Sequence, residues 1–205
     1  SQSKLAGERL VREAHGQQGL ATTVVRPGAI WGPGDPNVIP RIVALLRRGT
    51  LPLIGSGRNL LGLSHVSNLA EGLVMAGAAA CAAGQLYHLT DGEEITCSEA
   101  LDELAGALGL PRPRVSVPYW MLYGLAAVIE GLARLRRRTT PPPVSRYGVR
   151  FLACHSRYDI GKARRELGYR PSITFRAGVR SLAGLTQEPG DGPGSAPRLH
   201  GAADG

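Results

Sequence analysis

Cysteine is scarce in this chain of 205 residues, which contains three, at Cys81, Cys97 and Cys154. An odd number of widely spaced cysteines argues against a disulfide framework and against a thiolate metal site. The five histidines form no His-x-x-x-His pair or comparable cluster. We therefore expect no metal ion and a reducing, cytoplasmic location.

Two signals that would assign a protein to a known class are also missing. The first residues, SQSKLAGERL, have no apolar core and carry both signs of charge, so they do not read as a signal peptide. No Gly-x-Gly-x-x-Gly pattern follows a strand, because Gly55-Ser56-Gly57 is followed by a glycine only at Gly62. The sequence thus has no glycine-rich turn to hold the pyrophosphate of a dinucleotide.

Aromatic residues make up only 5% of the chain, although its net charge is +8 and its pI is about 10.0. The arginines gather at 134–138 and again at 146–170, but no recognised module with interleaved aromatic residues accompanies them. We therefore expect no nucleic-acid partner. The content of 43% hydrophobic and 20% charged residues is ordinary for a globular protein.

The most informative segment present is 21–35, ATTVVRPGAIWGPGD. Its apolar, β-branched run stops at Pro27-Gly28 and enters a loop rich in glycine and proline. This pattern is typical of a buried parallel strand that ends at a ligand crevice, where glycine lets the main chain approach a flat ring. An ordinary exit from a strand into a loop would give the same local pattern, and both interpretations stay open at this point.

The residues before this strand predict a helix with Lys4 at its start. Apolar positions recur at helical spacing at Leu5, Leu10, Val11 and Ala14. Together, SQSK and RPGAIWGPGD resemble the extended short-chain dehydrogenase/reductase (NAD-dependent epimerase/dehydratase) family. In that family a helix with Tyr-x-x-x-Lys precedes a strand ending in Arg-Pro-Gly and a Tyr/Trp-Gly-Pro loop. The tyrosine of the pattern would fall one position before Ser1.

The resemblance implies roles for seven residues. Lys4 would be catalytic, lowering the pKa of the tyrosine base, and would also hold the nicotinamide ribose, since residues four apart share a helix face. Main-chain contacts to the nicotinamide of NAD or NADP would come from Pro27, Gly28, Ala29 and Ile30, and substrate contacts from Trp31 and His65. The alternative for His65, a strand-end residue that only packs, stays open.

A second Tyr-x-x-x-Lys pattern runs from Tyr158 to Lys162. Asp159 is predicted to be the N-cap of the short helix that follows, which places Tyr158 before the helix and Lys162 within it. The two side chains would not share a helix face, so we exclude this pair as catalytic.

The resemblance implies an α/β fold: the C-terminal part of a Rossmann-type extended short-chain dehydrogenase, with its last parallel strands and a smaller α/β substrate domain, and without the N-terminal nucleotide-binding half. Residues 1–36 would be a remnant of the Rossmann domain, 37–186 mainly the substrate-binding domain, and 187–205 a disordered tail. Local patterns predict capping boxes at Asn68/Glu71 and Thr96/Glu99, and a strand within 147–160.

The substrate is indicated by what precedes His65-Val66. Nucleotide-sugar enzymes of the family typically carry a phosphate-binding arginine four residues before this pair, a position that Leu61 occupies here. An aliphatic side chain cannot replace a charge-assisted hydrogen bond, although Arg58 would substitute if the loop were rebuilt. The apolar stretch 59–63 and the apolar helix 119–135 look like the 3β-hydroxysteroid/sterol-4-carboxylate 3-dehydrogenase branch. We therefore expect NAD(P)-dependent oxidation of a ring hydroxyl on a sterol-like or other apolar alcohol.

Two alternatives to this activity remain: a nucleotide-sugar epimerase/dehydratase, and a noncatalytic fragment or pseudoenzyme binding module. The chain alone is expected to be inactive, because it contains neither the tyrosine base nor the glycine motif. Residues 119–138 are apolar with aromatic residues at one end and arginines at the other, which predicts peripheral membrane contact; a buried helix, or one covering a hydrophobic ligand, is the alternative. Self-association into a homo-oligomer is compatible with the sequence.

Overall fold

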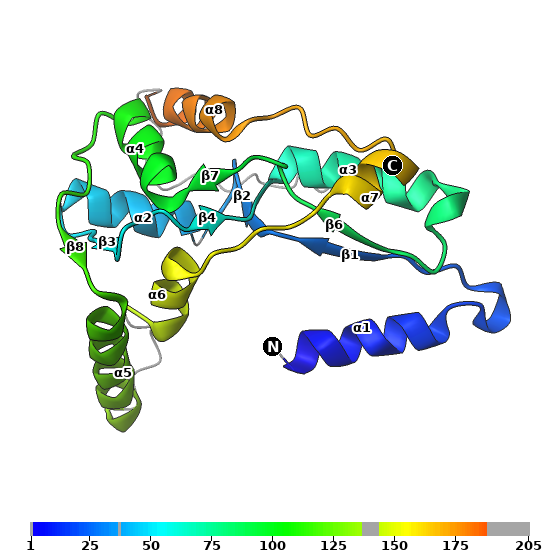
Figure 1. Cartoon of the computed structure of the whole chain (residues 1–205), viewed down its shortest axis with the longest axis horizontal. Coiled ribbons are helices and arrows are strands. Elements are labelled where there is room, and N and C mark those ends of the chain that lie inside the picture. The colour runs from blue at the N-terminus through cyan, green and yellow to red at the C-terminus, as the bar shows by residue number, and fades with distance from the viewer. Residues whose placement is uncertain (1, 37, 137–143, 188–205) are drawn as a thin grey trace, which may run out of the picture.

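The computed structural model describes residues 2–36, 38–136 and 144–187 of the chain (Figure 1). Of the tail predicted at 187–205, Gln187 belongs to the last helix and residues 188–205 lie outside these ranges. The last two residues of the predicted membrane segment also lie outside them. The helices are α1 (Gln2–Ala14), α2 (Val38–Arg47), α3 (Val66–Ala78), α4 (Cys97–Ala107), α5 (Tyr119–Leu135), α6 (Arg146–Ala153), α7 (Gly161–Glu166) and α8 (Phe175–Gln187). The strands are β1 (Val24–Pro27), β2 (Ala29–Trp31), β3 (Leu53–Ile54), β4 (Leu60–Leu61), β5 (Leu63–His65), β6 (Leu86–Leu89), β7 (Ile95–Thr96) and β8 (Ser116–Val117).

The strands pair mostly in parallel, which confirms the α/β prediction. β1 pairs with β6, β2 with β5, and β3 with β8 in parallel, whereas β4 and β7 are antiparallel. Each parallel pair joins strands that are far apart in sequence, because a parallel connection needs a crossover. β5 and β6 fall in the 37–186 range, yet they pair with β2 and β1 of the 1–36 range, so the two predicted ranges share two pairs of strands.

The β1–β6 pair is covered on one face by α3 and α7 (Figure 1). Tyr87 and Leu89 on β6 are buried there against Leu69 of α3 and Ala163 of α7. Gly72 allows the close approach of α3, because a Cβ at this position would lie 2.6 Å from a Leu89 methyl carbon. Alternating residues of β6 therefore supply this core, as expected for a strand.

A second core lies between α2, α4 and α8. It is built around Trp31 at the end of β2, with Leu46, Leu101, Leu104 and Phe175 from the three helices. The N-terminus of α2 is capped by the Asp35 carboxylate, whose oxygens accept hydrogen bonds from the backbone N–H groups of Val38 (3.1 Å) and Ile39 (2.8 Å). This cap orients the helix just after the Gly-Pro-Gly loop.

Local capping chemistry was predicted correctly at one helix and incorrectly at another. At α4, Thr96 and Glu99 form the predicted reciprocal capping box. The predicted box at Asn68 is wrong, because α3 begins two residues earlier, where His65 Nδ1 accepts from the Ser67 N–H at 3.3 Å. Asn68 instead turns inward and is 1% exposed.

The predicted strand within 147–160 is also wrong, because residues 146–153 form helix α6. Ser145 Oγ caps this helix by accepting from the Gly148 N–H at 3.1 Å, and Val149 is buried on the face that meets β3 and α5. The alternation of Tyr147, Val149 and Phe151 mimicked a strand, but the serine cap and the neighbouring helix favour the helical conformation.

α5 projects from the rest of the molecule beside α6 (Figure 1). It runs over the residues predicted for the apolar helix, and its Glu130 carboxylate accepts two hydrogen bonds from Arg146, through the backbone N–H and Nε, both at 2.8 Å. No helix in the described part of the chain is long and apolar enough to span a membrane.

Candidate functional site

The chain passes from β1 to β2 at Gly28, where two backbones come into close contact. The Ala29 N–H donates to the Gly62 carbonyl at 2.8 Å, and a Cβ on Gly28 would overlap that carbonyl group. The Gly28 N–H donates to Ser64 Oγ at 2.8 Å, and Ser64 Oγ in turn donates to the Leu89 carbonyl at 2.8 Å. The position thus requires glycine, and the buried Ser64 of β5 links the bend after β1 to β6.

A buried carboxylate, Asp91, organises the residues just beyond this crossing. Its Oδ2 accepts from the Trp31 indole N–H at 2.9 Å, and its Oδ1 accepts from the His65 backbone N–H at 2.7 Å and from Asn68 Nδ2 at 2.8 Å. Asp91 is 6% exposed. A buried charge is tolerated where hydrogen bonds surround it, so this residue joins the ends of β2, β5 and β6.

Trp31 and His65, the predicted substrate contacts, lie inside this network. Their side chains are 2% and 3% exposed, and their rings meet edge to face with centroids 4.9 Å apart. Burial lowers the pKa of His65 below its ordinary value of 6.5, against the opposing charge of Asp91. The contacts of His65 in this structure are those expected of a residue that packs at the end of a strand, which was the alternative interpretation. Contact of either residue with a substrate stays a prediction.

Lys4 lies on α1, which borders β1. Glu8, one turn after Lys4, makes a bidentate ion pair with Arg26 of β1, at 2.9 Å to Nε and 2.6 Å to the second guanidinium nitrogen. Residues four apart share a helix face, so Lys4 lies on the side of α1 toward β1. Figure 1 shows α1 and β1 running in opposite directions, so that the N-terminal end of α1 lies below the carboxyl end of β1, which Gly28 follows. Lys4 itself is exposed.

His88 and Tyr158 occupy the same face of β1–β6 as Arg26. The parallel register places Arg26 beside His88, and the Tyr158 ring stacks on His88 with centroids 5.4 Å apart. Burial and the nearby Arg26 charge lower the pKa of His88. Tyr158 precedes α7, whereas Lys162 lies within it and donates to Gln85 Oε1 at 2.6 Å, so the two residues have separate partners. The helix starts one residue later than predicted, with Ile160 at the N-cap position, but the Asp159 carboxylate does accept a hydrogen bond from the Gly161 N–H at 2.7 Å.

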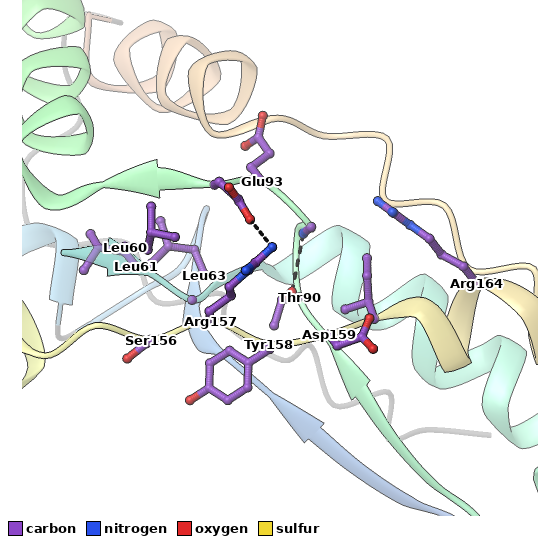
Figure 2. Close-up of a pocket in the computed structure, with 14 residues that line it drawn as sticks. Leu60, Leu61, Leu63, Thr90, Glu93, Ser156, Arg157, Tyr158, Asp159 and Arg164 are labelled. Atoms are coloured by element: carbon purple, nitrogen blue, oxygen red, sulfur yellow. Dashed lines mark hydrogen bonds and ion pairs between the residues drawn. The ribbon is translucent and has the colours of Figure 1, made fainter. Parts of the chain in front are cut away.

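A polar pocket of about 430 Å³ lies between the β4–β5 segment, the turn after β6 and the segment before α7 (Figure 2). Arg157 turns toward the turn after β6, where it pairs with Glu94 at 2.7 Å, while Tyr158 leaves the chain on the opposite side. Leu61 lines this pocket, in the position of the arginine expected in nucleotide-sugar enzymes. Neither Arg58 nor any of the seven predicted site residues lines it.

Two apolar cavities lie beside α2 and α6. The smaller, of about 30 Å³, is bordered by Ala29, Ile30 and Trp31 together with apolar residues of α2, α4 and α6. The larger, of about 390 Å³, lies between α2, β3 and α6. Ala29 and Ile30 of the predicted nicotinamide border therefore adjoin apolar side chains in the smaller cavity. Ile30 also lines a pocket of about 310 Å³ that it shares with the glycine-rich loop and Asp35.

Sequence reasoning missed three members of this arrangement: Asp91, Ser64 and the Glu8–Arg26 pair. Glu8 carried a signal, because it follows Lys4 by one helical turn, and Asp91 follows a buried strand directly. Nothing near Ser64 indicates that its hydroxyl would face Gly28, since that contact joins residues 36 positions apart.

The parallel crossovers and the glycine bend at the end of β1 are features of Rossmann-type α/β proteins. Residues 1–89 match the family model "NAD dependent epimerase/dehydratase family". The chain superposes on the crystal structure of the dTDP-glucose 4,6-dehydratase of Streptomyces venezuelae, solved with NAD and TYD, with a TM-score of 0.64 and 26% identity, covering 91% of this chain and 50% of that one.

Two relatives indicate which branch of this family the chain resembles. The chain is 34% identical to 3beta-hydroxysteroid-dehydrogenase/decarboxylase isoform 2 of Arabidopsis thaliana, over 98% of this chain and 39% of that protein. It is 35% identical to 2-alkyl-3-oxoalkanoate reductase of Stenotrophomonas maltophilia, over 80% of this chain and 51% of that protein. The chain is thus related to the extended short-chain dehydrogenases of the epimerase/dehydratase family and resembles their 3β-hydroxysteroid dehydrogenase branch. It spans about half the length of these relatives or less.

The close backbone contact at Gly28 predicts that this position does not tolerate an added methyl group. Gly28→Ala should lower the free energy of unfolding by about 2 kcal/mol, because the added Cβ must displace the Gly62 backbone. Gly77→Ala is the matched control: it lies at an exposed position of α3 with open space around it, and should change stability by less than about 1 kcal/mol, toward greater stability. Urea unfolding followed by circular dichroism measures both, and equal stabilities would contradict the close approach.

The Asp91 network predicts a larger loss. Asp91→Ala should lower the free energy of unfolding by about 4 kcal/mol, because three donors lose their acceptor in a buried place. Asp102→Ala, on half-buried α4, should cost about 0.5 kcal/mol or less. Urea unfolding followed by circular dichroism measures both variants, and similar losses would show that Asp91 is not a central acceptor.

Proposed function

We propose that this chain is part of a longer NAD(P)-dependent oxidoreductase that oxidises a ring hydroxyl of a sterol-like or other apolar alcohol. In such a reaction the nicotinamide ring of the bound cofactor takes hydride from the carbinol carbon, and a base takes the hydroxyl proton. Lys4 supplies the charge that favours the ionised base and holds the cofactor ribose. The chain alone is inactive under this proposal, because the base and the pyrophosphate-binding turn come from outside it.

The observation that carries this proposal is that the bend between β1 and β2 lies beside apolar side chains. β1 ends at Pro27, and its carboxyl end lies above the N-terminal end of α1, the helix that carries Lys4. Ala29 and Ile30 border the smaller apolar cavity. Leu61 removes the charge that would bind a substrate phosphate. The similarity to a hydroxysteroid dehydrogenase supports the same substrate class.

The role of Lys4 is tested by Lys4→Met in the gene product that carries this chain. We expect kcat/KM for NAD(P)+-dependent oxidation of a 3β-hydroxysterol to fall about 100-fold or more, because the neighbouring cation no longer favours the phenolate of the base. Absorbance of the reduced nicotinamide measures the rate.

Lys162→Met is the matched control, since it changes the lysine of the excluded Tyr158 pattern. Its rate should stay within about twofold of the unchanged protein. Comparable losses in both variants, or no loss at Lys4, would contradict the assignment.

A nucleotide-sugar substrate is the second candidate, and the polar pocket is the observation that favours it. Arg157 and Arg164 both line this pocket of about 430 Å³. Arg157 is 71% exposed at its side chain and could exchange Glu94 for a diphosphate. Turnover of dTDP- or UDP-sugars without turnover of sterols in the same assay would favour this candidate over the first.

Peripheral membrane contact through α5 is a further part of the proposal. One stripe of the helix, with spacing of four and three residues, is between 46% and 81% exposed; it consists of Met121, Leu125, Val128, Leu132 and Leu135. Trp120, at one end of α5, is 73% exposed, and arginines lie at the other end. Such a helix can lie in a lipid interface with its apolar face down.

Membrane contact is tested by co-sedimentation with vesicles of phosphatidylcholine and phosphatidylserine. The double change Leu125→Glu and Val128→Glu should reduce binding about tenfold or more, because two apolar side chains no longer enter the lipid. The control pair, Leu73→Glu and Val74→Glu on exposed α3, should leave it unchanged. Loss of a dimer in gel filtration with unchanged vesicle binding would instead assign the stripe to self-association.

A further inference from the structure

The first helix is attached to β1 by polar contacts rather than by a packed core. None of the described residues of α1 is buried, and its larger apolar side chains are 42% to 66% exposed; these are Leu5, Leu10 and Val11. Apolar burial therefore contributes little to the place of α1 on the sheet. The side chain of Glu8, which is 15% exposed, lies instead against the guanidinium of Arg26 on β1.

Glu8 and Arg26 meet through two parallel hydrogen bonds. One carboxylate oxygen accepts from Arg26 Nε at 2.9 Å, and the other accepts from a terminal guanidinium nitrogen at 2.6 Å. A contact of this kind fixes orientation as well as distance. The hydrogen bond from Arg26 lowers the pKa of Glu8, so the carboxylate stays ionised. Arg12 lies 4.0 Å from the same carboxylate, with its side chain 61% exposed.

His88 adjoins the strand side of this ion pair. It lies beside Arg26 in the parallel register, and the Tyr158 ring stacks on it. Burial and then the charge of Arg26 lower the pKa of His88, whereas Asp159 and Glu8 act in the opposite direction. The neutral ring is thus favoured, and it does not repel the guanidinium.

A further anchor lies at the C-terminal end of α1. His15, the residue after the helix, accepts a hydrogen bond at Nδ1 from the Thr22 N–H at 3.2 Å. Its ring also packs on Gly84, where a Cβ would lie 2.8 Å from Nε2. Glu8 and His15 are about 10 Å apart along the helix axis. Anchors separated in this way fix the direction of the helix as well as its place.

The ion pair also determines how far along β1 the helix lies. α1 and β1 run in opposite directions (Figure 1). From Glu8 back to Lys4 the helix covers about 6 Å, and from Arg26 forward to Gly28 an extended chain covers about 7 Å. Both steps lead the same way, so the pair brings Lys4 level with Gly28. A helix displaced by one residue would turn Lys4 by about 100°.

We infer that the Glu8–Arg26 ion pair positions Lys4, holding its ammonium level with the bend at Gly28. This inference rests on the proposed function, in which Lys4 favours the ionised base and holds the cofactor ribose. Glu8 and Arg26 act through Lys4 and touch neither substrate nor cofactor. Because the interaction between charges weakens with distance, a small displacement of α1 would reduce what Lys4 contributes.

The inference is tested with Glu8→Gln and Arg26→Gln in the gene product that carries this chain. Both variants should move the acidic limb of the pH dependence of kcat/KM upward by about one pH unit, because a displaced Lys4 lowers the pKa of the base less. KM for NAD(P)+ should rise about fivefold in both, while KM for the sterol stays within about twofold.

A direct effect of charge on the base predicts a different result. Glu8→Gln removes a negative charge and would move the limb to lower pH, whereas Arg26→Gln removes a positive charge and would move it to higher pH. Positioning predicts an upward shift in both, and a double variant no worse than either single change. Shifts of opposite sign, or additive losses in the double variant, would overturn the inference.

Amide hydrogen exchange of residues 2–14 tests the attachment of α1 without NAD(P) or substrate. Exchange should become about fivefold faster in both pair variants, because the helix is no longer held at its middle. Glu13→Gln and Arg9→Gln are the matched controls: each removes one charge from an exposed position of α1 and should change neither the exchange nor the limb. Unchanged exchange in the pair variants, or an equal change in the controls, would overturn the inference.

The inference and the proposed function fail separately. A large loss in Lys4→Met with an unchanged limb in both pair variants would overturn the inference alone. Faster exchange in both pair variants with no loss in Lys4→Met would support the attachment of α1 and overturn the proposed function. Circular dichroism checks the folding of each variant; if one pair variant is unfolded, the other decides through its exchange and its KM for NAD(P)+.

Discussion

The hydrogen bonds around the Asp91 carboxylate hold the candidate site together. Three donors from β2, β5 and α3 converge on one buried charge, and the charge is tolerated only while all three are present. Asn68 extends the network by bonding both backbone groups of Ile173, which precedes α8. The bend after β1, the core beneath it and the last helix are therefore positioned by the same group.

Leu61 separates two chemically different spaces. It lines the polar pocket that contains Arg157 and also the apolar cavity beside Ala29 and Ile30. A cation at this position would serve a phosphate in the first space and would be costly in the second. One aliphatic side chain therefore supports the proposed substrate class and also keeps the cavity beside Ala29 and Ile30 apolar.

Predictions succeeded where the decisive interactions lie within a few residues. The bounds of α5 follow from an apolar run, and the Thr96–Glu99 box joins neighbours three apart, so neither depends on distant partners. Asn68 also matched a capping pattern, but His65 took the capping role while Asn68 met Asp91 and Ile173, which are 23 and 105 positions away. Tyr147, Val149 and Phe151 alternate as in a strand, and only packing against β3 and α5 favours the helix.

Residue spacing was enough to indicate the family, the helix that carries Lys4, and the turn at Pro27-Gly28, because a short, contiguous run of residues identifies each of them. Folding was needed to bring Glu8 to Arg26, Ser64 to Gly28, and Trp31 and His65 into the core around Asp91. Those contacts join positions 18 to 60 apart, and the energy of a buried polar group depends on which partners reach it. No local pattern contains that information.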